Sequence, residues 1–365
     1  MVFLLDATLR EGAQSPAARL TRRRQLAILR GLAAVGIAEA EIGCAARDAD
    51  LAGLVRSARR VAPSLRLSVW CRGLPADIAL AASCRADVVH VSLPASDLHL
   101  RRRLGKDRDW LLRRVVAAAD EARRAGAAAV ALGLEDATRA APAVLVALAG
   151  VARAAGYCRL RLADTVSAAA PARMAELVRM VRSVFDGPVG VHCHDDFGMA
   201  TGNAVAAIEA GASWADGCLL GGGERAGTSR TEVLAAWLDI HGVLPLRIEA
   251  LPALCRRAAS ALGRRMDPFS PVVGSGIWRV SSGLHVDGLG KDPSTYEPFD
   301  PARVGAQRHL LLGAQSGRGA VRQVCLAHGC EPDEAELAQL VAAVRGGACD
   351  PDDIPSLLAK LRQEG

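Results

Sequence analysis

The amino-acid sequence predicts an α/β fold, a (β/α)8 or TIM barrel followed by a small, mostly helical C-terminal subdomain. Two observations carry this prediction. In the first 243 residues, short apolar runs alternate regularly with segments rich in alanine and arginine. Polar side chains follow at least five of these runs, and a barrel gathers the carboxyl ends of its strands at one face. A doubly wound eight-stranded sheet is the competing fold, but it accounts less well for this gathering.

The predicted strands are apolar runs, each followed by a segment with helical periodicity. The first of them, Val2 to Leu5, is continuously apolar, as in a strand that is buried on both faces. The eight runs cover residues 2–6, 38–43, 65–71, 87–93, 128–134, 158–163, 188–193 and 214–220.

The pattern changes after residue 243. We assign residues 1–243 to the barrel, residues 244–318 to a linker subdomain and residues 319–365 to a helical subdomain. The linker contains a basic helix followed by an irregular segment rich in glycine and proline. With 365 residues, 51% of them hydrophobic, the chain is long enough for one large domain and a smaller one.

Two histidines close the seventh predicted strand. His192 and His194 are two residues apart, and positions i and i+2 of a strand project to the same face. Both can therefore bind one metal ion. Glu11, which follows the first strand in FLLDATLREGAQ with Arg10 beside it, is the candidate third ligand. The alternative is that both histidines are ordinary half-buried residues and that Glu11 forms an ion pair at a helix start.

Further polar motifs follow other strands. LGLEDATR places Glu135 after the fifth strand, RLADTVS places Thr165 after the sixth, and GGGERAGTSRTE places Glu224 and Arg225 after the eighth. Arg72 follows the third strand. Each motif alone also fits a helix N-terminus or a tight turn. On successive strand ends, they together indicate one site.

Composition disfavours several classes of protein. The formal charge of +6 comes largely from arginines without interleaved aromatic residues, which disfavours a nucleic-acid partner but suits anionic substrates such as CoA esters. Ten cysteines without a C-x-x-C pair indicate free thiols. No apolar stretch reaches the roughly 18 to 20 residues of a membrane span, and no signal-peptide pattern follows Met1. We therefore expect a cytoplasmic protein without a membrane partner.

These motifs resemble the Claisen-condensing acyltransferases related to isopropylmalate synthase, within the metal-dependent barrel family that includes hydroxymethylglutaryl-CoA lyase. The segments LSVWCR, SLPASD, GLHVDGLGKDPSTYEPFDPARVG and LLLGAQSG are most similar to homocitrate synthases, especially the short type that serves nitrogenase cofactor assembly. The similarity runs nearly end to end.

The resemblance implies a divalent metal site and a carboxylate-binding arginine. In DATLREG, Glu11 matches a metal ligand, and Arg10 matches the residue that orients the keto-acid carboxylate and polarises its carbonyl. HCHDD supplies His192 and His194 as the other ligands. An acid and two histidines suit Mg, Mn, Zn, Fe or Co in varying degree, so the native ion stays open.

The resemblance also implies substrate and catalytic residues. Thr165 matches a residue that contacts the substrate carboxylate, and Glu135 matches an acid near the reacting carbonyl. Arg72, at the end of the third strand, is a further candidate for substrate binding. His285 in GLHVDG and Tyr296, eleven residues on, match a catalytic pair that the family delivers from the neighbouring subunit of a homodimer. His285 is the expected base that deprotonates the methyl group of acetyl-CoA, with Tyr296 and Glu135 completing the proton relay.

Several positions depart from the family pattern. They leave the metal ligands intact but put the keto-acid pocket in question. The departures are Asp195 for asparagine in HND, Ser167 for glycine in DTVG, Thr228 for asparagine in GERAGN, Ala314 and Gln315 in LGKHSG, and the loop 43–47.

The sequence thus predicts a homocitrate synthase that condenses acetyl-CoA with 2-oxoglutarate and hydrolyses the thioester. The alternatives are a sibling condensing enzyme with another 2-oxo acid, giving citramalate or isopropylmalate, a retro-aldol lyase, or a non-catalytic metal-binding barrel. Only about fifty residues follow QSG, so no leucine-feedback domain is expected. The discriminating side chains of the acceptor pocket cannot be placed from sequence, because one methylene or carboxylate changes few contacts.

Overall fold

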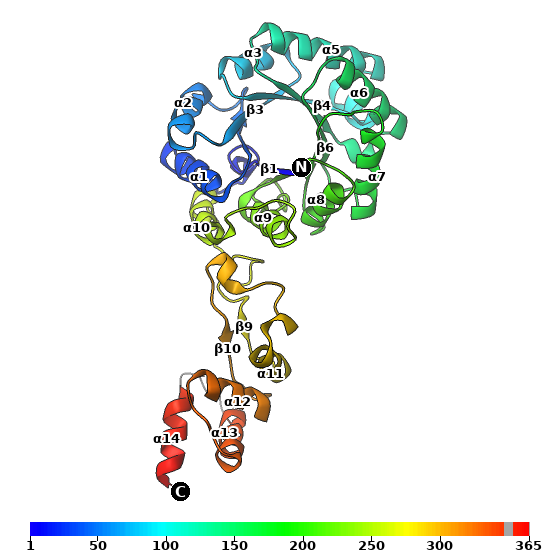
Figure 1. The fold of residues 1–365 in the computed structure, drawn as a ribbon. Coiled ribbons are helices and arrows are strands. Elements are labelled where there is room, and N and C mark those ends of the chain that lie inside the picture. The colour runs from blue at the N-terminus through cyan, green and yellow to red at the C-terminus, as the bar shows by residue number, and fades with distance from the viewer. Residues whose placement is uncertain (347–352, 365) are drawn as a thin grey trace. The chain divides into compact units, whose positions relative to one another are not determined.

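The computed structural model describes residues 1–346 and 353–364, and the chain divides into two compact units, residues 1–266 and 267–365. The first unit is a closed barrel of eight parallel strands in chain order (Figure 1). β1 pairs with both β2 and β8, which closes the sheet. The strands are β1 Phe3–Asp6, β2 Glu39–Cys44, β3 Arg66–Arg72, β4 Val88–Pro94, β5 Val130–Glu135, β6 Arg159–Asp164, β7 Val189–Cys193 and β8 Trp214–Gly217. The predicted barrel is confirmed.

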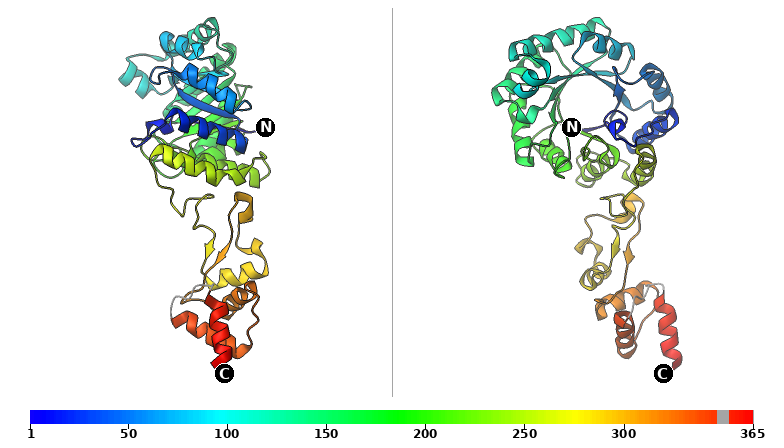
Figure 2. Two further views of the ribbon diagram at one scale, coloured as in Figure 1. Left: turned by 90° about the vertical axis from the view of Figure 1, so that its left-hand side faces the viewer. Right: turned by 180° about the vertical axis from the view of Figure 1, so that it is seen from behind.

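Helices surround the sheet, as the views in Figure 2 show. Their ends follow local chemistry: the Thr21 hydroxyl accepts a hydrogen bond from the Arg24 N–H at the start of α1, and Gly36 ends α1 in the left-handed region at φ 99°. The main helices are α1 Arg22–Val35, α2 Leu51–Val61, α3 Pro75–Ser83, α5 Arg108–Arg124, α6 Pro142–Ala154, α7 Pro171–Arg182, α8 Ala200–Glu209, α9 Thr231–Ile240 and α10 Leu251–Leu262.

The predicted strands agree with the structure to within two residues at each end, except at the end of the eighth. We predicted a strand over residues 214–220, but β8 ends at Gly217. Beyond it, the Cys218 N–H donates to Ser229 O, in the loop that follows, and Leu220 takes a left-handed conformation at φ 56°. The apolar run therefore continues past the strand because these residues are buried in a turn.

The barrel interior contains charged side chains in place of the branched apolar layers that usually fill it. Arg159 of β6 donates to Glu39 of β2 (Nη2 to Oε1, 2.6 Å), and Arg161 donates to Glu41 (Nη1 to Oε1, 3.0 Å). β2 and β6 are not neighbours in the sheet, so these ion pairs cross the interior. Arg161 also donates to Asp216 of β8 at 2.5 Å.

The second unit contains short elements around its own apolar cluster. β9 Arg279–Val280 pairs in parallel with β10 His309–Leu310, and the helices are α11 Gly283–Lys291, α12 Arg318–Ala327, α13 Glu334–Gly346 and α14 Ile354–Glu364. Val286 of α11, Val321 of α12 and Leu340 of α13 belong to the buried cluster. The unit is mostly helical, as predicted.

The compact units do not follow the three-part division that we expected. α10 lies in the first unit and contacts α1, whereas our division placed it in the linker of residues 244–318. Burial explains this: Leu254, Ala258 and Leu262 of α10 are buried. The boundary between residues 318 and 319 stays a prediction.

The described part of the chain contains no membrane-spanning helix and no disulfide bond. None of its helices combines the length and the apolar character that crossing a membrane requires. Its cysteines are free thiols.

Candidate metal centre and active site

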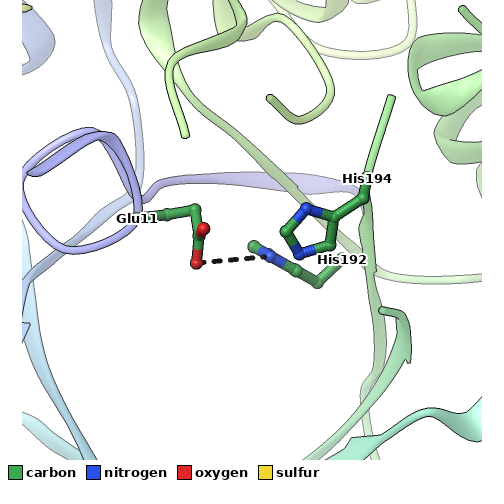
Figure 3. Close-up of side chains that lie close together, drawn as sticks. All are labelled: Glu11, His192 and His194. Carbon is green, nitrogen blue, oxygen red and sulfur yellow. Dashed lines mark ion pairs between the residues drawn. The ribbon is translucent and has the colours of Figure 1, made fainter. Parts of the chain in front are cut away.

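Glu11, His192 and His194 form a buried cluster at the carboxyl ends of β1 and β7 (Figure 3). One potential ligand atom of each residue lies within 4.8 Å of the others. Glu11 Oε2 is 4.0 Å from His192 Nε2, and the imidazole rings are 5.3 Å apart between centroids. The structure thus brings together the three residues that we predicted as ligands.

Unused polar atoms in the cluster fit a cation. Glu11 Oε1 and His194 Nδ1 are buried and have no hydrogen-bond partner among the described residues. Buried polar atoms without partners are costly, and a bound ion would satisfy them. A carboxylate with two imidazoles is also a donor set typical of divalent metals, so the residues fit the predicted metal.

The protonation states favour ligation. Burial lowers the pKa of His192 and His194, so both imidazoles are neutral near pH 7. Burial alone would raise the pKa of Glu11, but the charge of Arg10 beside it lowers that pKa below its ordinary value. A neutral imidazole and an ionised carboxylate are the forms that bind metals.

Asp216 of β8 fixes the orientation of His192. Its Oδ2 lies 3.2 Å from His192 Nδ1, so a protonated Nδ1 donates to Asp216 and leaves Nε2 directed toward Glu11. Asp216 is itself held by Arg161. Such carboxylate–histidine pairs fix the tautomer and raise the basicity of a ligand.

Arg10 is held rigidly next to the cluster. Its Nε donates to Glu41 Oε2 at 2.5 Å, its Nη1 donates to Glu11, and its guanidinium lies 5.6 Å from the centroid of the Trp70 ring. The side chain is nearly buried. A carboxylate that enters the site would therefore meet a preoriented cation beside the metal ligands.

A cavity of about 610 Å³ opens over this cluster. All of its lining residues belong to the first unit. The residues predicted for the site that line it are Arg10, Glu11, Arg72, Glu135, Thr165, His192, His194, Glu224 and Arg225.

The predicted substrate residues are engaged with neighbours inside this cavity. Glu135 accepts two hydrogen bonds from Arg103, at 2.7 and 2.6 Å. Arg72 pairs with Asp77 through Nε at 2.5 Å. The Thr165 hydroxyl accepts from the Asp136 N–H at 2.8 Å. A substrate must share or displace these partners.

His285 and Tyr296 lie in the second unit. Their rings stack on each other with centroids 4.1 Å apart. Gly288 permits this contact, because a Cβ there would lie 2.8 Å from Tyr296 Cδ2. The structure thus pairs the two residues with each other, and their part in the active site stays a prediction.

Three departures from the family pattern have structural partners. The Ser167 hydroxyl donates to Asp196 Oδ2 at 2.9 Å, and Ser167 has the left-handed φ of 52° that glycine adopts more easily. Thr228 forms an antiparallel bridge with His194, so the replaced asparagine position adjoins the cluster. Asp195 accepts from the Ala200 N–H and stabilises the start of α8.

Sequence reasoning missed the outer partners of the site. Glu41, Arg161, Asp216 and Arg103 were not predicted as site residues, although all four contact predicted site residues or their partners. A signal existed for the first three: each is a charged residue inside an apolar strand, where only pairing makes burial tolerable.

Comparison with known proteins agrees with the fold. Residues 1–252 match the HMGL-like family, and residues 272–350 match the family described as homocitrate synthase post-HMGL domain-like. The chain belongs to the HMGL-like family. Within it, the resemblance to homocitrate synthases that the motifs indicated is confirmed by the matched second domain and by the relatives below.

The chain is 40% identical over 320 residues to a homocitrate synthase of Frankia alni, covering 87% of this chain and 91% of that one. It is 34% identical to a 2-phosphonomethylmalate synthase of Streptomyces rubellomurinus (strain ATCC 31215), covering 98% of each chain. Among solved structures, the HMG-CoA lyase of "Bacillis subtilis" superposes with a TM-score of 0.66 at 18% identity, over 74% of this chain and 96% of that one. That superposition supports the barrel fold alone.

Proposed function

We propose that the protein is a homocitrate synthase, which condenses acetyl-CoA with 2-oxoglutarate and releases homocitrate and CoA. One observation carries the proposal: the buried cluster of Glu11, His192 and His194 lies beside the preoriented Arg10 in a chain that is 40% identical to a homocitrate synthase. This arrangement suits a 2-oxo acid, whose carboxylate and keto oxygen are adjacent.

Arg10 would bind the carboxylate of the 2-oxo acid, since its guanidinium is directed by Glu41 and stacked near Trp70. A divalent ion held by Glu11, His192 and His194 would supply the positive charge that stabilises an alkoxide at the keto carbon. Thr165 would contact the substrate carboxylate with its hydroxyl, and Arg72 would attract the second carboxylate of 2-oxoglutarate.

The carbon nucleophile requires a base. We assign removal of the methyl proton of acetyl-CoA to His285, with Tyr296 stacked on its ring and Glu135 completing the relay. We expect a homodimer in which the second unit of one subunit serves the barrel of its partner. Light scattering tests this expectation, and an active monomer would contradict it.

Condensation of acetyl-CoA with another 2-oxo acid is the second candidate function. The similarity to a 2-phosphonomethylmalate synthase extends over 98% of both chains, so the acceptor acid is open at this level of identity. Thr228 pairs with His194 and departs from the family pattern, which makes a different acceptor chemically reasonable.

Release of CoA from acetyl-CoA, followed with a thiol reagent, tests the proposal. Metal-reconstituted protein is offered 2-oxoglutarate, pyruvate, 2-oxoisovalerate, oxaloacetate and phosphonopyruvate. We expect a clear preference for 2-oxoglutarate. A preference for another acid would establish the sibling reaction, and no release with any of them would overturn both.

Two variants test the assigned roles. Glu11→Gln should lose both bound metal and turnover, whereas Glu224→Gln, an exposed carboxylate of the same cavity, should keep its metal. His285→Ala should lose turnover but still bind metal and 2-oxo acid. Full activity of His285→Ala would remove it as the base.

A further inference from the structure

We propose that a basic groove at the rim of the cavity binds the phosphate groups of the acyl-CoA substrate. The groove is formed by Arg101, Lys106 and Arg113 around Trp110. The inference rests on the proposed function, because it names the part of the molecule that holds the anionic end of the same substrate.

The groove continues the active-site cavity. Its volume is about 530 Å³, and Lys106 and Trp110 line both hollows. It follows β4, at the barrel face where the metal cluster lies, and it extends into the first turns of α5. A ligand that lies in the cavity can therefore extend directly into the groove.

The local backbone directs neighbouring arginines to different places. Leu100–Leu104 form a single π-helical turn that contains Arg101, Arg102 and Arg103. Arg103 turns toward Glu135 in the cavity, whereas Arg101 lines the groove. Gly105 ends the turn in the left-handed region at φ 62°. No atom lies within 4 Å of the position that a Cβ would take, so the space beside Gly105 is open.

Ion pairing separates the arginines of the cavity from the cations of the groove. Each arginine that lines the cavity pairs with at least one carboxylate; they are Arg10, Arg47, Arg72, Arg103, Arg161 and Arg225. Lys106 has no carboxylate partner among the described residues, and its ammonium lies 5.9 Å from the centroid of the Trp110 ring.

The other cations of the groove are equally available. Arg113 forms no ion pair within residues 1–346 and 353–364, and Arg101 has only a 3.8 Å contact with Asp97 while its side chain is 74% exposed. Asp107, the acid of the groove, accepts a hydrogen bond from the backbone N–H of Trp110 and so stabilises the start of α5. With three cations and one carboxylate, the groove therefore carries excess positive charge.

The shape of an acyl-CoA explains such an arrangement. Its thioester must reach the metal cluster, while its pantetheine arm spans the cavity and its phosphates remain near solvent. Solvated phosphates need exposed cations, which attract them over a distance and at little desolvation cost. A small 2-oxo acid, in contrast, is expected to be bound wholly within the cavity by Arg10.

Two double variants with the same change of charge test the site. Lys106→Gln with Arg113→Gln removes two cations of the groove. Arg56→Gln with Arg60→Gln removes two exposed cations of α2 that line neither hollow and is the control. Calorimetry measures the binding of CoA, dephospho-CoA, adenosine 3′,5′-bisphosphate and inorganic phosphate to each full-length protein.

We expect the groove variant to bind CoA about ten-fold more weakly, as loss of two exposed charge contacts predicts, and the control to match the unmodified protein. The unmodified protein should bind CoA more tightly than dephospho-CoA, and its affinity should fall with added salt. The ratio of kcat/KM for acetyl-CoA to that for S-acetylpantetheine, which lacks the phosphates, should fall about ten-fold in the groove variant.

Failure of this inference is distinct from failure of the proposed function. If the unmodified protein condenses acetyl-CoA with a 2-oxo acid and the groove variant keeps the same CoA affinity, the groove is not the phosphate site. Equal competition by inorganic phosphate and adenosine 3′,5′-bisphosphate would reduce it to a general anion site. A changed oligomeric state with unchanged CoA affinity would assign the groove to a subunit interface and overturn the proposal. No CoA binding and no turnover in the unmodified protein would instead overturn the proposed function.

Discussion

At the scale of single residues, Asp216 links the metal cluster to the charged interior of the barrel. It contacts His192 on one side and Arg161 on the other, and Arg161 also pairs with Glu41, which holds Arg10. Two functional groups, a predicted ligand and a predicted substrate-binding arginine, thus share one buried network. Such pairs stabilise little by themselves, so their positioning role explains them better than stability does.

Asp216→Asn should weaken metal binding about 10- to 100-fold, because an amide orients and polarises the imidazole of His192 less strongly than a carboxylate does. Excess metal should restore much of the turnover. Metal titration with a competing chelator measures the affinity. Asp120→Asn, an exposed acid of α5 that pairs with Arg123, is the control. Unchanged affinity in Asp216→Asn would show that His192 is oriented without it.

The ligand cluster was predictable because His192 and His194 obey the two-residue repeat of a strand and follow an apolar run. The interior charges were not identified because the sequence does not show which face of a strand lines the barrel. In RLRLAD, Arg159 and Arg161 alternate with Leu160 and Leu162. Only the closed sheet shows that the arginines point across to Glu39 and Glu41.

At the scale of elements, the glycine-rich loop after β8 supports the site from the side. Thr228 and His194 form an isolated antiparallel β-bridge, and the Asp195 N–H donates to Gly227 O at 3.0 Å. Gly227 has φ 98°, and a Cβ at this position would clash with the carbonyl oxygen of Gly221. The loop therefore requires glycine for a close backbone approach, not only for a turn.

Gly227→Ala should displace the loop and loosen His194, lowering both the metal affinity, by about ten-fold or more, and the free energy of unfolding, by about 1–3 kcal/mol. Gly242→Ala is the control: its φ is also positive, at 68°, but no atom lies within 4 Å of the added Cβ. Chemical denaturation and metal titration of both variants separate the clash from the backbone strain. Equal effects in the two would show that the close approach is unimportant.

Element boundaries were predictable where apolar runs and strand ends coincide, as for β7, predicted at residues 188–193 and found at Val189–Cys193. β8 was predicted too long because burial continues into a turn at Leu219 and Leu220. Apolar character reports burial, whereas strand ends depend on backbone pairing that the sequence does not show.

At the scale of the whole molecule, two buried acids lie where the first and last strands of the barrel meet. Asp6 of β1 accepts a hydrogen bond from the Thr231 hydroxyl at 2.7 Å, and Glu232 accepts one from the Leu220 N–H at 2.9 Å. Burial raises the pKa of Asp6 to about 6 and that of Glu232 to about 7. Both acids therefore titrate in the folded protein well above their ordinary range.

The contribution of Glu232 to stability should fall as the pH rises from about 4.5 to about 7. In this window the unfolded chain ionises Glu232, whose ordinary pKa is 4.5, while the folded protein retains the proton, so the unfolded state is favoured with rising pH. Glu232→Gln should reduce the change in the free energy of unfolding over this pH range by up to about 3 kcal/mol. Urea unfolding at pH 5 and pH 7.5, without metal, measures it. Glu176→Gln changes an exposed carboxylate and is the control; it should behave as the unmodified protein. If Glu232→Gln showed the same dependence of stability on pH as the unmodified protein, Glu232 would not be its source.

The two compact units should separate in function. A chain that ends at Met266 retains the barrel, α10 and the metal cluster, but lacks His285 and Tyr296. It should fold cooperatively and bind metal like the full chain, yet release no CoA. Circular dichroism, metal analysis and the thiol assay measure these properties. Turnover by this shorter chain would place the base within the barrel.

The closure of β1 against β8 has a consequence for biosynthesis. Glu11 is made early, but its partners His192 and His194 follow about 180 residues later, and the Asp6–Thr231 hydrogen bond later still. Long-range closure of this kind forms slowly, and the emerging chain exposes unpaired strand edges meanwhile. A nascent chain on the ribosome therefore has no complete ligand set, and the ion can be acquired only after nearly the whole barrel has been translated.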